Sequence, residues 1–210
     1  MTAAATRRRL QTSLVLGVGL GSTGYIAAIT IATIVAKELA GGSSFAGLPG
    51  ATIVLGSAAA SHVLSRFMVL YGRRAGLVLG YGIGAAGALG AGVAVVLASF
   101  PLFIAATAAM GCANAANQLS RYTAADMYPE SGRASAIGVG VWGATLGSIV
   151  GPNLITLSGN IAEGFNLPRL AGVYGVPILF VTAAALLTLS SPCALLLNPL
   201  RQSAHVSLGA

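Results

Sequence analysis

The stretch from Ala113 to Pro152, ANAANQLSRYTAADMYPESGRASAIGVGVWGATLGSIVGP, joins a polar face, a charged turn and a glycine-rich segment that ends in Gly-Pro. Four polar residues share one side of a helix, at spacings i, i+3, i+4 and i+7, and are called the polar stripe below: Asn114, Asn117, Gln118 and Arg121. Residues 101–113 carry no charge, so the helix is otherwise apolar. Amides in hydrocarbon are costly unless they face protein or water. The polar stripe therefore indicates either a contact between helices or a wet cavity.

The composition around this stretch is that of a membrane protein. Charged residues make up 7% of the chain, against about 25% in soluble domains, and apolar residues make up 56%. Six apolar segments are long enough to cross a hydrocarbon core of about 30 Å: residues 14–36, 50–70, 75–97, 101–120, 134–157 and 171–197. Continuous rather than alternating apolar runs favour helices over a barrel. We expect an all-α membrane protein with six transmembrane helices in a single domain, residues 1–210.

The distribution of basic residues predicts the orientation of these helices. With the N-terminus inside, nine basic residues lie on the cytoplasmic side: Arg7, Arg8, Arg9, Arg66, Arg73, Arg74, Arg121, Arg133 and Arg201. Only Lys37 and Arg169 lie on the other side. We therefore expect a multi-pass protein of the cytoplasmic membrane with both termini in the cytoplasm. The net charge of +7 sets orientation in the lipid bilayer, and we expect no nucleic-acid partner.

Glycines at steps of four predict close contacts between helices. The third segment carries such a series with one alanine in it, Gly76, Gly80, Gly84, Ala88 and Gly92. The fifth segment carries Gly143, Gly147 and Gly151. Pro152 follows the second series and removes a helical hydrogen bond, which predicts a bend near the outer end of the helix.

The turn between the second and third segments resembles a signature of the major facilitator superfamily. The family pattern is Gly-x-x-x-Asp-Arg/Lys-x-Gly-Arg/Lys-Arg, and Gly72, Arg73 and Arg74 match its end. Val69 replaces the aspartate of the pattern and Leu70 its first basic residue. The resemblance implies that this turn takes part in gating.

Two further stretches are similar to the same family. Asp126 and Arg133 stand where the family's cytoplasmic turn between the fourth and fifth spans has Asp and Arg. The fifth segment resembles the antiporter-type signature Gly-x8-Gly-x3-Gly-Pro-x2-Gly-Gly, and its matching residues are Gly138, Gly147, Gly151 and Pro152. Ile155 and Thr156 replace the last two glycines of that signature.

The resemblance covers nearly all of the chain, as the N-terminal six-span half of a twelve-span family. It implies half of a major-facilitator-type bundle, built from two inverted three-helix repeats. The implied function is alternating-access transport of a small-molecule substrate, with efflux as one candidate direction, by a half transporter or a truncated member. Tyr25 in the first span joins the polar stripe as a candidate for the substrate cavity, although a neighbouring helix could equally satisfy its hydroxyl. The implied partner is a second six-span half, in the same or another chain.

Two other classes of function remain as alternatives. The first is a non-transporting membrane subunit or remnant. The second is an intramembrane enzyme with Ser22 as nucleophile, but His62 is the only histidine within a span and no supporting signature surrounds either residue. His62 could instead carry protons or make a structural hydrogen bond. Cys112 and Cys193 show no metal or redox spacing, so we expect no catalytic residue, metal or cofactor.

Overall fold

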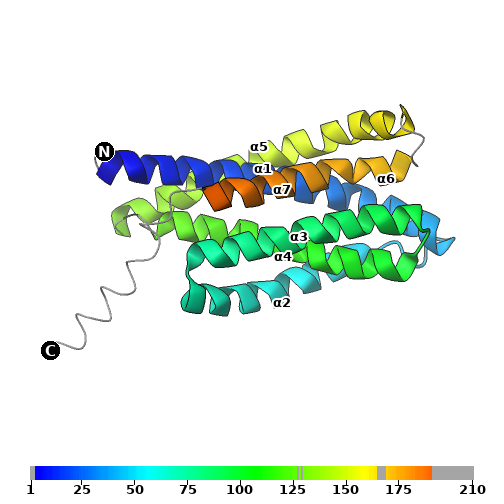
Figure 1. The fold of residues 1–210 in the computed structure, drawn as a ribbon, viewed down its shortest axis with the longest axis horizontal. Helices are drawn as coiled ribbons and strands as arrows, with labels where there is room; N and C mark the ends of the chain where they lie inside the picture. Colours follow the sequence, from blue (N-terminus) through cyan, green and yellow to red (C-terminus); the bar gives the residue numbers. More distant parts are fainter. Residues whose placement is uncertain (1–2, 127, 129, 165–168, 191–210) are drawn as a thin grey trace.

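The computed structural model describes residues 3–126, 128, 130–164 and 169–190, with side chains for those from residue 11 onward except Arg169 (Figure 1). Its helices are α1 (Ala3–Ala40), α2 (Leu48–Tyr71), α3 (Arg73–Val96), α4 (Phe100–Ala125), α5 (Glu130–Gly164), α6 (Arg169–Val173) and α7 (Gly175–Ser190). The described residues contain no β-strand. The prediction of an all-helical protein is confirmed over this part of the chain.

Proline and glycine set the ends of several helices. Pro49 and Pro101 lie in the first turns of α2 and α4, where the missing N–H of proline costs no helical hydrogen bond. Gly72 is the single residue between α2 and α3, with φ +90° and ψ 158°. Its N–H donates to the Met68 carbonyl at 2.9 Å. Because this backbone region is essentially restricted to glycine, Gly72 is what allows the chain to reverse within one residue.

Five described helices are long and apolar enough to cross a membrane: Gln11–Ala40, Leu48–Tyr71, Arg73–Val96, Glu130–Gly164 and Leu170–Ser190. With 26 residues, α4 is also long enough, but it is not among them. The amide side chains of its polar stripe lower its mean hydropathy. The same residues that indicate an interior site thus weaken the membrane signal of the helix that carries them.

The sixth predicted span is interrupted. Its predicted range, 171–197, begins in α6 and continues in α7, with a break at Tyr174. Pro177 has no N–H to donate to the Val173 carbonyl, so the helical ladder cannot continue through this point. The Ile178 N–H donates to the Tyr174 carbonyl at 3.1 Å. Residues 191–197 of the predicted span lie outside the described part of the chain.

Successive long helices run in opposite directions (Figure 1). The α2–α3 and α4–α5 connections lie at the end where α1 begins, and the α1–α2 and α3–α4 connections lie at the opposite end. The helices α2, α4, α1 and α5 contact one another in that order. In addition, α3 packs along α4, α7 packs along α1, and α3 and α7 touch each other.

The predicted glycine contacts are confirmed, because several glycines bring backbones into direct contact. A Cβ atom on Gly147 of α5 would collide with the Gly19 carbonyl of α1, and one on Gly151 would lie 2.6 Å from the Thr23 carbonyl. On the other side of the bundle, a Cβ on Gly84 of α3 would lie 2.8 Å from the Ala113 backbone nitrogen of α4. Such close approach is typical of helix packing in membranes. The helix α5 continues through Pro152, and the bend there stays a prediction.

Candidate functional site

The centre of the polar stripe is a hydrogen-bonded cluster that joins three helices. The Asn117 amide of α4 lies 2.7 Å from the Ser22 hydroxyl of α1 and 2.8 Å from the Tyr81 hydroxyl of α3. In the orientation that satisfies every neighbour, Asn117 Oδ1 accepts from Ser22 and Nδ2 donates to Tyr81 and to the Val18 carbonyl. The Tyr81 and Ser120 hydroxyls are 3.3 Å apart. The cluster is buried, so it holds α1, α3 and α4 together in a setting where unpaired polar groups are costly.

Asn114 and Gln118 differ from Asn117 in their surroundings. The Asn114 amide is half-buried and donates to the Ser57 hydroxyl of α2 at 3.0 Å. The Gln118 side chain is exposed and has no hydrogen-bond partner among the described residues. The polar stripe is therefore divided: Asn117 points into the bundle, whereas Gln118 lies on its surface.

Arg121 lies one helical turn beyond Asn117 and is half-buried. Its stem lies against α5, where a Cβ atom on Gly140 would be 3.2 Å from Arg121 Cγ. The Nε atom is shielded from solvent and finds no hydrogen-bond partner within the described residues. A buried neutral donor without a hydrogen-bond partner costs about 1–3 kcal/mol of stability, and a charged donor costs more. Arg121 is thus a cation that the described part of the chain leaves incompletely satisfied.

Tyr25, the candidate from the first span, is half-buried on α1. Its hydroxyl makes no hydrogen bond to any described residue. Within the described residues, the Tyr25 hydroxyl is therefore not bonded to a neighbouring helix, which was the alternative expectation.

The two turns that resemble family signatures meet at one end of the bundle. Arg73, at the start of α3, pairs with Asp126, at the end of α4, with 2.6 Å between Nη2 and Oδ2. The two side chains are 33% and 44% exposed, so this ion pair contributes little stability by itself. It does link the α2–α3 turn to the α4–α5 turn. The family's aspartate is absent at Val69, and Asp126 provides a carboxylate for the turn instead.

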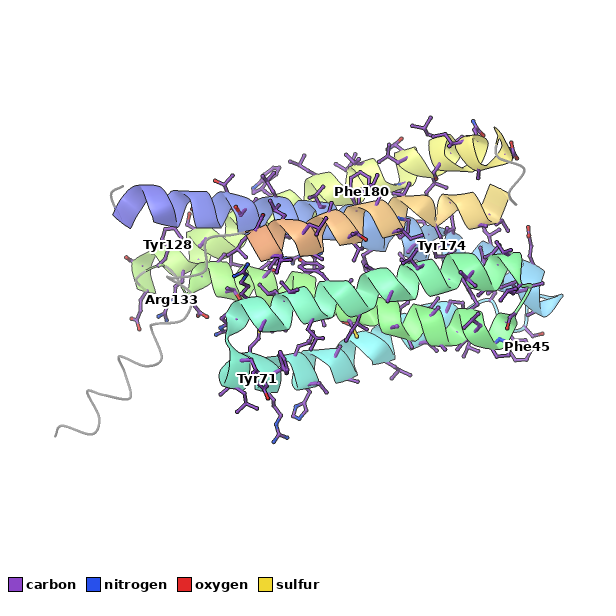
Figure 2. The ribbon with its side chains drawn as sticks, in the orientation of Figure 1. Phe45, Tyr71, Tyr128, Arg133, Tyr174 and Phe180 are labelled. Carbon is purple, nitrogen blue, oxygen red and sulfur yellow. The ribbon has the colours of Figure 1, made fainter. Side chains whose placement is uncertain are left out.

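Other basic residues at this end reach backbone carbonyls. Arg74 donates to the Leu189 carbonyl near the end of α7, and Arg133 Nε donates to the Tyr128 carbonyl at 3.4 Å. Figure 2 shows Tyr128 and Arg133 together at this end, with Phe45 at the opposite one. We call this end, which holds Arg66, Arg73, Arg74 and Arg133, the basic end.

The residues of the fifth-span signature have different surroundings. Gly147 and Gly151 form the backbone contact with α1, whereas a Cβ on Gly138 would meet nothing within 4 Å. Pro152 is half-buried beside Gly151. Only part of the signature therefore serves packing between the described helices.

Sequence reasoning missed the partners of the polar stripe on other helices. Tyr81 lies in the glycine series of α3, where a lone polar side chain between apolar neighbours is the signal that could have identified it. Ser22, the nucleophile of the enzyme alternative, uses its hydroxyl on Asn117. His62 lies exposed on α2 and makes no hydrogen bond to the described residues. No group of three His, Cys, Asp or Glu side chains in the described ranges is arranged to hold a metal ion.

Comparison with known proteins identifies relatives of one family. The sequence profile of the Major Facilitator Superfamily matches residues 14–208. The uncharacterized MFS-type transporter YdeG of Bacillus subtilis (strain 168) is 34% identical over 167 residues, 80% of this chain and 38% of its own length. The uncharacterized MFS-type transporter YddS of the same strain is 35% identical over 154 residues, 73% and 35% of the two chains. The riboflavin transporter RfnT of Brucella anthropi is 28% identical over 190 residues, 88% and 48% of the two chains. The chain spans less than half the length of these curated relatives.

Proposed function

Because the chain belongs to the Major Facilitator Superfamily, we propose that it forms a six-helix half of a transporter that moves a small molecule across the cytoplasmic membrane by alternating access. The observation that carries this proposal is the divided polar stripe. Asn117 is fully engaged between helices, but the adjacent Gln118 leaves an amide exposed on a helix otherwise suited to a membrane. Exposed polar side chains at membrane depth mark a substrate pathway or a contact with further protein.

The connections of α4 support six crossings of the membrane. Both α3 and α5 are apolar enough to span, and α4 joins them through short connections at opposite ends of the bundle. A helix that joins two spanning helices in this way must itself cross the bilayer, and its polar stripe then faces protein or water rather than lipid. The basic end, by its charge, is the cytoplasmic end.

The packing pattern supports two inverted repeats of three spans. Exchanging α1 with α4, α2 with α5 and α3 with α7 preserves the main helix contacts. The closest backbone contacts correspond as well: a Cβ on Gly56 of α2 would collide with the Ala108 carbonyl of α4, as one on Gly147 would with the Gly19 carbonyl. Tyr25 lies six residues after Gly19 on α1, and Asn114 lies six residues after Ala108 on α4. Both candidates thus hold equivalent, half-buried positions in the two repeats.

We assign contact with the substrate to Tyr25, Asn114, Gln118 and Arg121, whereas Asn117 holds the helices that carry them. The backbone contact between α1 and α5 is smooth because it is made by Gly147 and Gly151, and a smooth contact suits small rocking movements. The Arg73–Asp126 pair ties the turns at the cytoplasmic end, where a gate would act.

The outward faces of α2 and α5 support a partner unit. They expose large apolar side chains, including Leu55 and Val63 on α2 and Trp142 and Leu146 on α5. Asn153, a polar side chain within the α5 span, is also exposed. A second six-helix unit, in the same or another chain, would cover these faces, in agreement with the greater length of the relatives. A non-transporting subunit would need the same faces, so it remains the second candidate function.

A transport experiment in which the cargo need not be chosen beforehand tests the proposal. The purified chain, native or Gln118→Leu, is reconstituted in liposomes, with and without a co-expressed second half. The liposomes are then incubated with a ¹³C-labelled cytoplasmic extract to which riboflavin has been added. We expect at least one compound to accumulate inside liposomes with the native chain and at least tenfold less with Gln118→Leu, although the variant inserts normally. Equal accumulation of every compound in native, variant and protein-free liposomes would exclude transport and favour the subunit.

A further inference from the structure

The guanidinium of Arg121 has no carboxylate partner in the described part of the chain. The described acidic residues are Glu38, Asp126, Glu130 and Glu163. Asp126 pairs with Arg73, and Glu130 is exposed in the first turn of α5. Glu38 and Glu163 lie near the ends of α1 and α5, at the opposite end of the bundle. The charge of Arg121 is therefore not neutralised by any of them.

The groups near Arg121 are neutral. Asn117 precedes it by one turn on the same side of α4, with Ser22 and Tyr81 bonded to it. On the α5 side, Gly140 offers only backbone, and its missing side chain leaves room for the arginine stem. The surroundings thus fix the stem of Arg121 but supply no negative charge.

This arrangement suits the recognition of an oxyanion. A guanidinium presents paired donors that match a carboxylate or phosphate, and such bonds strengthen where water is scarce. The fixed stem reduces the loss of side-chain freedom on binding. Exposed Gln118, three residues before Arg121, offers a neutral amide nearby. The arginines of the basic end would also draw anions towards it.

We propose that Arg121 binds a carboxylate or phosphate group of the transported molecule, so that the cargo is an organic anion. This inference rests on the proposed transport function. The same chemistry is offered by the phosphate of an anionic lipid, because Arg121 lies about one turn from the end of α4. The two sources are separated by whether a water-soluble anion competes for the site.

Binding is measured by thermal unfolding of the purified full chain in an uncharged maltoside detergent. Inorganic phosphate or succinate is titrated at constant ionic strength, with chloride as the balancing anion. We expect a saturable rise of the midpoint, about 3–6 °C at ten times the dissociation constant. Arg121→Gln should abolish the rise. Arg121→Lys should keep part of it, because the charge remains without the paired donors of the guanidinium. Lys37→Gln removes an exposed charge at the opposite end of the bundle and should respond like the native chain.

Nanodiscs of phosphatidylcholine, with or without phosphatidylglycerol, provide the lipid arm. The proposal would be overturned in favour of a lipid site if phosphatidylglycerol stabilised the chain in a way that depends on Arg121 and neither soluble anion had an effect. An equal response of native chain and Arg121→Gln to the soluble anions would also overturn it. Since this assay requires no transport, loss of anion binding in a chain that still transports refutes only the cargo assignment. Anion binding without any transport refutes the proposed function.

Discussion

Asn117→Leu is expected to lower the free energy of unfolding by about 1–3 kcal/mol. The variant loses the interhelical hydrogen bonds of Asn117 to Ser22, Tyr81 and the Val18 carbonyl, and such bonds contribute about 0.6 kcal/mol each on average. The Ser22 and Tyr81 hydroxyls would then be buried without the amide that joins them. The site has little room to adjust, since a Cβ on Gly21 would already lie 2.7 Å from the Asn117 side-chain amide. Unfolding is measured in detergent micelles by heat and by titration with a denaturing detergent.

Gln118→Leu is the matched control, because it makes the same change at the adjacent position. Its side chain is exposed and unbonded, so we expect the free energy of unfolding to change by less than about 0.5 kcal/mol. The division of the polar stripe would be contradicted if Asn117→Leu were as stable as the native chain. It would also be contradicted if both variants lost the same free energy of unfolding.

Gly147→Ala is expected to destabilise the chain by about 1–3 kcal/mol, the cost of overpacking where the neighbours cannot yield. The added Cβ would meet the Gly19 carbonyl and would lie 3.0 Å from the Thr23 backbone nitrogen, and both belong to the α1 backbone. To accommodate it, α1 and α5 must move apart where their backbones touch. The measurement is the unfolding midpoint of the detergent-solubilised variant.

Gly138→Ala provides the control within the same signature. A Cβ there would meet nothing within 4 Å, and alanine in a helix interior is favoured over glycine by up to about 1 kcal/mol. We expect stability equal to the native chain or slightly higher. If both alanine variants lose the same stability, backbone contact does not explain why the signature has glycine at position 147.

The helical class and the approximate bounds of the long helices followed from the sequence, because hydrocarbon imposes a simple rule on apolar length. The segment predicted at 75–97 is α3, Arg73–Val96, and the one at 134–157 lies within α5, Glu130–Gly164. The break at Tyr174 was missed although Pro177 carries the signal. Proline is tolerated in transmembrane helices often enough that its presence alone did not separate α6 from α7.

The roles within the polar stripe could not be predicted from its periodicity. At about 100° per residue, the four positions spread over roughly 100° of the helix surface, which is wide enough to face more than one neighbour. Asn117 meets α1 and α3, and Asn114 meets α2. Which neighbour each side chain meets depends on helix order in space. Likewise, nothing in the local sequence pairs Arg73 with Asp126, which are 53 residues apart.

The central claim, six crossings with the basic end in the cytoplasm, is tested most directly by cysteine labelling in intact cells. Cys112 and Cys193 are first replaced by alanine, and single cysteines are then introduced at Ser43, Ser131 and Asn160, which are all exposed. An impermeant thiol reagent should label positions 43 and 160 in intact cells and position 131 only after permeabilisation. Labelling of position 131 but not 160 in intact cells would show that α4 does not cross, and the claim would be wrong.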